Sequence, residues 1–316
     1  MRRLDMTMIH GAICILVGVE MECRFVSILY LKDEGDYISL KQIIMNQDKT
    51  VGVLLPVYKG DNPKYIKQSV NSLLKQTYKK IIIYVGVDGP VYDEVDRTLK
   101  DISDGRVRII RFEQNRGLAK VLNDLISQAR LDECEYYARM DADDISLPDR
   151  FAKQVLFLEQ NPEVDVVGGA IDEIDEESKD TGKRVSYPMT NMECRKFFRY
   201  RDPFAHPAVM FKNRFFDKVK GYRPEYRKNQ DTMLWYDGFL NGCVFSNLNS
   251  VVLKFRVTSD FYNRRNGWKR AKQMLRDRLR INRDLKYDLS ANLFAYAMFL
   301  MTISPNIVKK ILYKIR

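Results

Sequence analysis

Apolar residues between positions 50 and 168 fall into two alternating patterns. Continuous apolar runs, which are typical of buried strands, cover Val51–Val57, Ile81–Val87, Val107–Phe112, Tyr136–Met140 and Val164–Gly168. Between these runs, apolar residues recur three and four positions apart, as they do on one face of a helix. The repeated strand–helix order predicts a mainly parallel central sheet with helices on both faces. The fold class is therefore expected to be α/β, with a Rossmann-like first half.

The chain after residue 168 follows a less regular pattern. A strand is expected after His206, a turn at Gly221–Arg223, and a helix that begins at Gln230 and Asp231. Asp231 has two interpretations, as a cap of that helix or as a general base at the ligand edge of the sheet. His206 is one of two histidines, and a lone histidine beside a strand end is commonly structural. For both residues the sequence leaves the alternatives open.

Residues 1–49 do not share this order of elements. Gly11–Val19 is an apolar run that resembles the core of a signal peptide, but acidic side chains stand close on either side of it. The run is shorter than roughly 20 residues, the length that crosses a bilayer as a helix. We expect residues 1–49 to be a dispensable extension from an upstream start codon, with Met21 or Met45 as the alternative start.

Charge is distributed unevenly along the chain. The net charge is +11, and residues 264–316 alone hold fourteen Lys or Arg against three Asp. The rest of the chain is therefore neutral, and only its last segment is expected to bind an anionic surface. Five scattered cysteines without a Cys-x-x-Cys pair exclude the usual Cys/His zinc site and argue against a disulfide framework. This usage is typical of a reducing compartment.

The basic segment 264–316 also has an apolar pattern. Residues with helical spacing lie among its lysines and arginines, at Trp268, Ala271, Leu275 and Leu279. Such a pattern is typical of a helix that lies on a membrane surface. The apolar stretch Leu289–Ile303 follows and is too short for a transmembrane span. We expect a basic amphipathic helical tail with interfacial or re-entrant membrane attachment; the alternative is a solvated helix packed on the preceding domain.

The most evident chemistry lies in the acidic step Arg139–Asp144, where an apolar run ends in three carboxylates within four residues. Asp141 and Asp143 share a face of an extended backbone. Repulsion between crowded carboxylates destabilises the folded chain unless a cation neutralises their charge. Oxygen ligands of this kind suit Mg²⁺ or Mn²⁺. Because ligands of open α/β sheets bind at strand ends, the step predicts a divalent metal site that handles phosphate. The alternative is an ordinary turn and helix cap before Pro148.

Further motifs stand in a fixed order around the acidic step. They are Leu55–Tyr58, Asp88–Gly89, Asn115–Ala119 with Asn123, Arg139–Asp144, Gly221–Arg223 and Gln230–Asp231. From Val51 to about Arg265 the chain resembles glycosyltransferase family 2, the inverting sugar transferases with the GT-A fold. The resemblance implies a GT-A domain at 50–263, between the extension 1–49 and the tail 264–316. Neither a G-x-G-x-x-G loop nor a P-loop follows the first strand, which disfavours dinucleotide and kinase sites.

The resemblance also implies a role for each motif. A nucleotide-sugar site would be formed by Pro56, Val57, Tyr58, Asp88, Asn115, Gly117, Arg139 and Asp141. Asp143 would hold the metal, Asp88 would accept a hydrogen bond from uracil, and Asp231 would be the catalytic base. His206 and Gln230 are candidates for contact with the acceptor or a phosphate.

The implied function is transfer of a hexose from a UDP-sugar to a saccharide carried on undecaprenyl diphosphate, with Mn²⁺ or Mg²⁺ as cofactor, in O-antigen, capsule or exopolysaccharide synthesis. The Q-x-x-R-W motif of processive synthases is not found in this sequence, so one sugar per encounter is expected. The expected place is the cytoplasmic face of the cell membrane, as a peripheral protein, without a specific nucleic-acid partner. The alternatives are a sugar-phosphate nucleotidyltransferase, whose Gly- and Arg-rich loop is missing, and a membrane or nucleic-acid adaptor, which would not need the acidic step.

Overall fold

The computed structural model of the chain describes residues 49–258 and 268–304, together with four short strands in the first 48 residues. β1 (Asp5–Ile9) pairs antiparallel with β2 (Ala12–Leu16), and β3 (Leu29–Leu31) pairs antiparallel with β4 (Tyr37–Ser39). Most of the extension 1–49, and the last residues of the tail, lie outside the described part. That the extension is dispensable stays a prediction.

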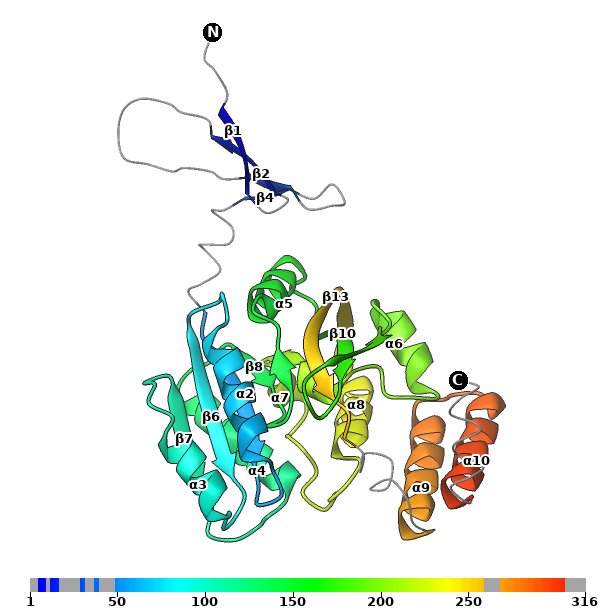
Figure 1. The fold of residues 1–316 in the computed structure, drawn as a ribbon. Helices are drawn as coiled ribbons and strands as arrows, with labels where there is room; N and C mark the ends of the chain where they lie inside the picture. Colours follow the sequence, from blue (N-terminus) through cyan, green and yellow to red (C-terminus); the bar gives the residue numbers. More distant parts are fainter. Residues whose placement is uncertain are drawn as a thin grey trace.

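One nine-stranded sheet forms the centre of the described chain (Figure 1). Its order is β7 (Val107–Arg111), β6 (Ile81–Val87), β5 (Val51–Val57), β8 (Tyr136–Arg139), β12 (Met210–Lys212), β10 (Val166–Ile174), β13 (Phe245–Arg256) and β9 (Ile145–Ser146), with β11 (Asp180–Val185) paired to β10. The first four strands are parallel to one another, as are β10 and β13. β12 runs antiparallel to both of its neighbours and joins the two parallel parts. The predicted mainly parallel α/β sheet is confirmed.

The later strands are where the pattern-based prediction was incomplete. The strand expected at Val164–Gly168 runs instead from Val166 to Ile174, and β11 was not predicted. The sequence also predicts a strand at Phe255–Val257, and this is only the end of β13, which has 12 residues. These strands carry half-buried and exposed positions, so their sequence lacks the continuous apolar run that marks strands covered on both faces.

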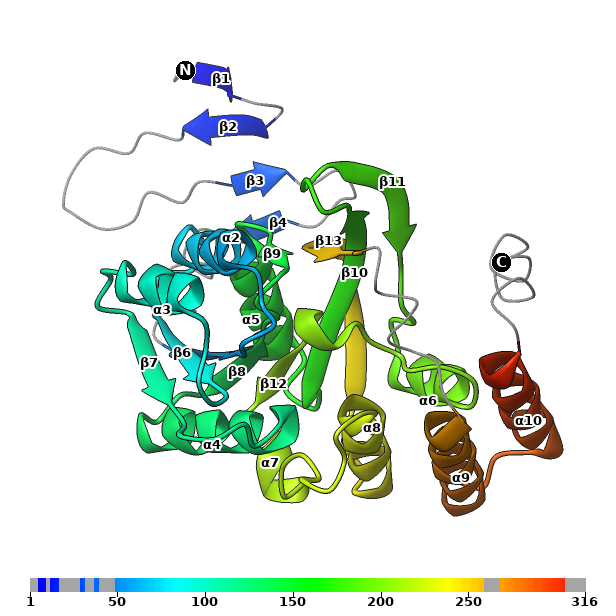
Figure 2. The ribbon, with the colours of Figure 1, turned by 60° about the horizontal axis from the view of Figure 1, so that its bottom comes forward.

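Helices cover both faces of the sheet (Figure 2). One face carries α2 (Pro63–Leu74), α3 (Asp93–Lys100) and α5 (Arg150–Gln160); the other carries α4 (Leu118–Leu131), α7 (Phe215–Lys218) and α8 (Gln230–Leu240). α6 (Asn191–Phe198) and the 3₁₀ turn η2 (His206–Ala208) lie in the connection between β11 and β12. Asn62 caps α2 by accepting from the Lys64 N–H at 2.9 Å, with Pro63 in the first turn, as its sequence predicts.

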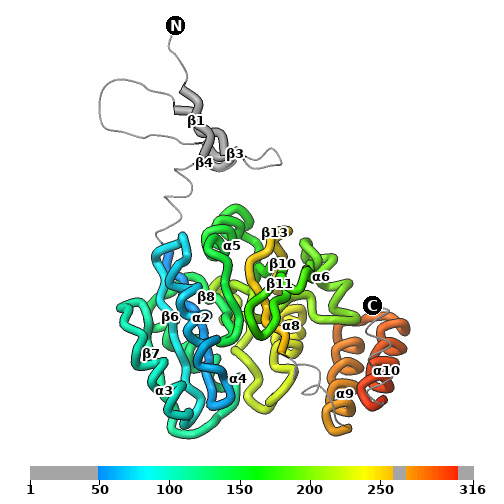
Figure 3. Tube along the Cα trace, viewed as in Figure 1, coloured from blue at the N-terminus to red at the C-terminus, as the bar shows by residue number. Residues whose placement is uncertain are grey.

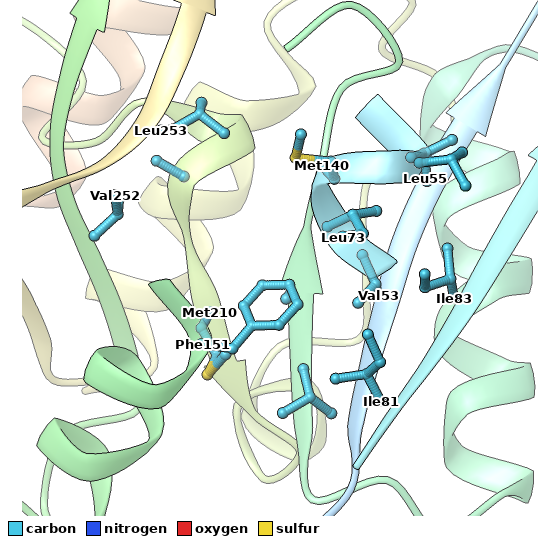
Figure 4. Packing of buried hydrophobic residues seen from close by; sticks show 14 of the residues in the cluster. Val53, Leu55, Leu73, Ile81, Ile83, Met140, Phe151, Met210, Val252 and Leu253 are labelled. Atoms are coloured by element: carbon cyan, nitrogen blue, oxygen red, sulfur yellow. The ribbon is translucent and has the colours of Figure 1, made fainter. Parts of the chain in front are cut away.

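The core consists of two apolar clusters, one on each face of the sheet. We call the cluster under α2, α3 and α5 the α2–α5 cluster, and the cluster under α4, α7 and α8 the α4–α8 cluster. Successive residues of a strand point to opposite faces, so Ala138 and Met140 join the α2–α5 cluster and Tyr137 between them joins the α4–α8 cluster. Figure 4 shows part of the first cluster, in which Val53 and Ile83 of neighbouring strands meet apolar residues of α2 and α5. The strand that delivers the acidic step is therefore fixed on both faces.

The C-terminal segment forms two helices, α9 (Trp268–Asp284) and α10 (Leu289–Ile303), which lie side by side at the end of the molecule far from β7 (Figure 3). Asp277 of α9 is buried and accepts from the Tyr226 hydroxyl at 2.9 Å, and Ile281 is buried in the α4–α8 cluster. The alternative of a helix packed on the preceding domain therefore describes α9. Within the described residues, none of the helices combines the length and apolar character that crossing a membrane requires.

Candidate active site

The acidic step lies at the edge where the parallel strands end. β8 leads directly into it, and the carboxylate oxygens of Asp141, Asp143 and Asp144 lie within 4.8 Å of one another. β5 and β6 run parallel to β8 and end at the same edge, which places Tyr58 and Asp88 on the same edge of the sheet as the acidic step. The structure therefore brings together the three strand-end motifs that the sequence singled out.

Asp61 is a fourth carboxylate at this site, and the sequence analysis did not select it. Its Oδ2 accepts from the Tyr58 backbone N–H at 2.8 Å, which folds the loop after β5 back on itself. Burial, together with the charges of Asp143 and Asp141, raises the pKa of Asp61 to about 7. The signal was present: Asp61 follows the end of β5 by four residues, as Asp143 follows the end of β8.

Asp143 and Asp144 are destabilised as anions in the same way. Burial raises the pKa of Asp143 to about 6, with the charge of Asp141 as the next cause. The pKa of the fully buried Asp144 is raised well above its usual range by burial and then by Asp143 and Asp141. Asp144 Oδ1 accepts from the Arg256 backbone N–H at 2.8 Å, whereas its Oδ2 has no hydrogen-bond partner among the described residues.

These carboxylates fit a divalent cation. Several oxygens converge, one of them is buried without a partner, and mutual repulsion leaves charge that a cation would neutralise. The chemistry of the donor set, which is oxygen alone, favours Mg²⁺ or Mn²⁺ over zinc or copper. The donors of the acidic step therefore fit a divalent cation, and the alternative of an ordinary solvated turn does not explain its buried oxygens.

Three buried arginines support the acidic step from behind. Arg139 donates to the Met140 carbonyl and to Asp141 Oδ1. Arg150, from the start of α5, donates to the Arg139 carbonyl at 2.9 Å, and burial lowers its pKa to about 9. Arg256, at the end of β13, donates to the Asp143 carbonyl at 2.8 Å and to Gln68 Oε1 at 2.9 Å. Only Arg139 was selected from the sequence; Arg150 belongs to the helix that follows the acidic step, and Arg256 lies 113 residues beyond Asp143.

Replacing Arg256 by Met is expected to lower the free energy of unfolding by about 3 kcal/mol. The reason is that buried oxygen atoms, which now accept hydrogen bonds from the guanidinium, would be left without a donor. Urea denaturation measures the change. Arg283→Met is the matched control, since that side chain is 75% exposed. Equal stability of both variants would contradict a supporting role for Arg256.

The metal-free protein should also lose stability as its carboxylates ionise. An acid whose pKa is raised by folding holds its proton more tightly in the folded chain, so its contribution is full below pH 3.8 and is lost as the pH rises through about 7. Between pH 5 and pH 8 the melting temperature of the wild type should therefore fall relative to Asp61→Asn in chelator. Differential scanning fluorimetry measures this difference, with Asp149→Asn as a control at a surface ion pair. If the difference in melting temperature between the wild type and Asp61→Asn did not depend on pH, the raised pKa of Asp61 would be refuted.

The nucleotide-side motifs form one loop assembly. Asp88, buried after β6, accepts from the backbone N–H groups of Arg116 at 2.6 Å and Gly117 at 2.9 Å. Asn115 donates to the Asp88 carbonyl at 3.2 Å. Gly117 has a φ of 88°, and Gly89 has a φ of 84° with its Cα so close to Asn115 that a Cβ would lie 2.6 Å from the Asn115 nitrogen. Asp88 therefore orders the loop that precedes α4.

The residues predicted at the end of β5 differ in their surroundings. Val57 is buried in the core, and its carbonyl accepts from the Asp88 N–H at 2.8 Å. Pro56 is half-buried, and Tyr58 is 40% exposed beside the acidic edge. Of the three, Tyr58 offers the most side-chain surface to a ligand.

The predicted acceptor side is anchored by a contact across 99 residues. Asn123 of α4 donates to the Tyr222 carbonyl at 2.8 Å and accepts from the Tyr222 N–H at 2.8 Å. The Tyr222 hydroxyl lies 2.7 Å from His206 Nε2. Burial lowers the pKa of His206 well below its usual range, and Arg139 lowers it further, so the ring is neutral at pH 7. The structural interpretation of His206 is supported by this bond.

Asp231 lies close to this pair. It is half-buried in the first turn of α8, while the cap position belongs to Asn229, which has a φ of 62°. Burial raises the pKa of Tyr222, Arg139 opposes this rise, and the charges of Asp231 and Asp141 add to it. Both carboxylates therefore act on one hydroxyl group. The neighbouring Gln230 has a buried Oε1 without a hydrogen-bond partner among the described residues.

Comparison with known proteins agrees with this arrangement. The sequence model described as Glycosyl transferase family 2 matches residues 52–219, which include the acidic step and end before Asp231. The amylovoran biosynthesis glycosyltransferase AmsE of Erwinia amylovora is 36% identical over 225 residues, 68% of this chain and 79% of that protein. A UDP-Gal:alpha-D-GlcNAc-diphosphoundecaprenol beta-1,3-galactosyltransferase of Escherichia coli is 28% identical over 82% of this chain and 90% of its own length.

Solved structures agree on the fold. The structure of S. aureus TarS 1–349 in complex with UDP-GlcNAc superposes with a TM-score of 0.54 at 17% identity, over 81% of this chain and 82% of that chain. This likeness supports the GT-A fold. Because the family model matches more than half of the sequence and the Erwinia relative is 36% identical over 68% of it, the chain belongs to glycosyltransferase family 2.

Proposed function

We propose that this chain is a non-processive, inverting glycosyltransferase that moves one hexose from a UDP-sugar to a hydroxyl group of a saccharide carried on undecaprenyl diphosphate. The observation that carries the proposal is the convergence of Asp141, Asp143 and Asp144 at one sheet edge, inside the region that the family model matches. A donor diphosphate would bind at the acidic step, and the acceptor hydroxyl would lie at Asp231 of α8.

The donor nucleotide would occupy the loops after β5 and β6. Asp88 uses one lone pair on each oxygen to hold the loop before α4, and a carboxylate has further acceptor sites for a uracil N–H. Tyr58, exposed next to these loops, offers an aromatic face to the base. Arg139 is held by Asp141, which places a positive charge at the inner end of the acidic step.

Asp141 and Asp143 would hold Mg²⁺ or Mn²⁺, which when bound supplies neutralisation of the charge that develops on the departing diphosphate. Asp231 would take the proton of the acceptor hydroxyl while the oxygen of that hydroxyl forms the bond to the anomeric carbon. The bond from that carbon to the diphosphate oxygen breaks, and the nucleoside diphosphate leaves with the electron pair. Neutral His206 fixes Tyr222 beside Asp231, and Gln230 offers an unpaired oxygen to the acceptor.

The descriptions of two relatives support this substrate class. The Escherichia coli relative is described as using UDP-Gal and an undecaprenol-diphosphate-linked GlcNAc, and the Erwinia relative as acting in amylovoran biosynthesis. The TarS structure holds UDP-GlcNAc. We therefore propose bacterial surface polysaccharide synthesis as the process, and the cytoplasmic face of the cell membrane as the place where donor and lipid-linked acceptor meet.

The two alternatives receive less support. A sugar-phosphate nucleotidyltransferase would need a basic phosphate loop after β5, where the structure has the acidic Asp61. A non-enzymatic membrane or nucleic-acid adaptor does not require the convergence of carboxylates at one sheet edge. Family membership also favours sugar transfer over both.

Calorimetric titration with UDP-, GDP- and dTDP-sugars, with and without Mn²⁺, tests the proposal. We expect one UDP-sugar to bind in the presence of Mn²⁺ and this binding to be lost in Asp143→Ala. A preference for GDP- or dTDP-sugars would correct the donor. Absence of nucleotide binding under every condition would overturn the proposed function.

A further inference from the structure

The outward face of α10 is apolar to a degree that is unusual for the surface of a globular protein. The helix has 15 residues and none of them is charged. Its exposed large side chains are Leu289 at 70%, Leu293 at 62%, Tyr296 at 50%, Leu300 at 59% and Ile303 at 38%. With 3.6 residues per turn these five positions fall within about 80° of one another, so they form one stripe along the helix. We call this row of five residues the α10 stripe.

The remaining sides of α10 already have their packing partners. Ala291 and Ala295 are buried, the ring of Phe294 lies 5.0 Å from that of Tyr200, and the ring of Phe299 lies 5.4 Å from that of Trp268. The helix is thus held in place by one face. The α10 stripe is left over after this packing and is not part of the core.

The neighbouring helix supplies positive charge instead of apolar surface. The exposed side chains on one face of α9 include Lys269, Lys272 and Arg276. Trp268 connects the two surfaces, because its 54% exposed ring contacts Phe299 of α10 and lies 5.2 Å below the Lys272 ammonium. An amphipathic membrane helix combines a basic and an apolar face in one element. Here the two faces are divided between the helices of one hairpin.

We propose that the α10 stripe, with Trp268 and the basic face of α9, docks this chain on an anionic lipid surface. Leucine side chains would enter the boundary between headgroups and acyl chains, Trp268 and Tyr296 would lie at headgroup depth, and the lysines would meet the phosphates. This refines the sequence-based prediction, since the docking face lies on α10, whereas Ala271 of the predicted α9 stripe is buried. The docking proposal deepens the proposed function. Only the biological purpose of docking, which is to bring the site to a lipid-linked acceptor, rests on that function.

Charge favours lipid over a second copy of the chain as the partner. In a two-fold symmetric pairing the same surface of each copy meets the other, so the lysines and arginines beside the stripe would be brought together. Like charges in such a contact are costly, whereas an anionic bilayer neutralises them. The twelve residues that follow the helix pair of the described chain also carry Lys309, Lys310, Lys314 and Arg316 and no acidic side chain.

Co-sedimentation of the full chain with lipid vesicles tests the proposal without any sugar. We expect binding to phosphatidylcholine vesicles that contain about one-third phosphatidylglycerol, and weaker binding to phosphatidylcholine alone. The emission of Trp268 should shift to the blue, while the fully buried Trp235 stays unaffected. Leu293→Glu/Leu300→Glu should weaken vesicle binding by about tenfold or more.

Leu131→Glu is the matched control, because Leu131 is 76% exposed on α4 and lies outside the stripe. It should bind vesicles like the wild type. Lys269→Gln/Lys272→Gln should reduce binding to the anionic vesicles by about fivefold for each lysine removed. Vesicle binding that is equal in wild type and Leu293→Glu/Leu300→Glu would overturn the proposal, as would no vesicle binding by the wild type.

Two further outcomes would assign the stripe to another partner. A dimer that dissociates in Leu293→Glu/Leu300→Glu, without a change in vesicle binding, would show that a second copy covers it. A fall in the melting temperature of the same variant would show that the chain's own remaining residues cover it. Donor binding measured by calorimetry should be unchanged in this variant, so failure of the docking proposal is distinguishable from failure of the proposed function.

Discussion

Replacing Asp231 by Asn is expected to lower kcat for sugar transfer by about 10³-fold, within the range that general base catalysis contributes. The amide has nearly the shape of the carboxylate but cannot take the proton of the acceptor hydroxyl. Donor binding should change little, because the donor-side residues belong to other elements. Initial rates with the donor found by calorimetry, together with its Kd for the variant, measure both effects.

The same substitution separates the two interpretations of Asp231. Asn and Asp are similarly favoured at a helix start, so a residue that only supported α8 could be replaced without loss of turnover. Asp217→Asn, at a 62% exposed side chain paired with Arg130, is the control and should leave kcat unchanged. Full turnover by Asp231→Asn would reject the base assignment.

Replacing Asp143 by Asn should have effects of opposite sign on function and on stability. Loss of a carboxylate from the cation site should weaken Mn²⁺-dependent donor binding by at least about 10²-fold and reduce turnover accordingly. In chelator at pH 8, however, the variant should melt at the same temperature as the wild type or higher. The reason is that burial and the neighbouring Asp141 raise the pKa of Asp143 to about 6, so its ionised form costs the folded state free energy.

Calorimetry and thermal melts in chelator or in Mn²⁺ distinguish this outcome from simple misfolding. The melting temperature of the wild type should rise when Mn²⁺ is added, and that of Asp143→Asn should not. Asp149→Asn is the control, five residues beyond the last carboxylate of the acidic step, and its melting temperature should rise as that of the wild type does. A large loss of stability in metal-free Asp143→Asn would mean that Asp143 stabilises the fold and is not strained by it.

The sequence predicted those parts of the site that follow directly from strand ends. Val51–Val57 and Ile81–Val87 were predicted with the bounds that the structure shows, since strands buried on both faces carry uninterrupted apolar runs. Asp88 and the acidic step follow such runs, so their common edge could be inferred. Their assigned roles as nucleotide and metal ligands stay predictions, because no ligand is bound in the structure.

Contacts between distant elements were not predictable. Arg256 reaches Asp143 across 113 residues, and Asn123 holds Tyr222 across 99. A buried arginine has no sequence signature that separates it from a surface arginine, because burial depends on which elements pack around it. Asp61 was overlooked although it follows the end of β5 by four residues, because burial, the main cause of its raised pKa, arises only when the chain folds.

The sequence by itself determined the α/β order, the position of the acidic step and the location of the charge surplus, because local periodicity and composition encode these features. Only the tertiary structure decided which carboxylates share a site, which arginines compensate them, and which face of the C-terminal helices remains bare. These properties depend on desolvation and on distances between side chains. Such quantities arise when separate segments pack against one another, and no single segment contains them.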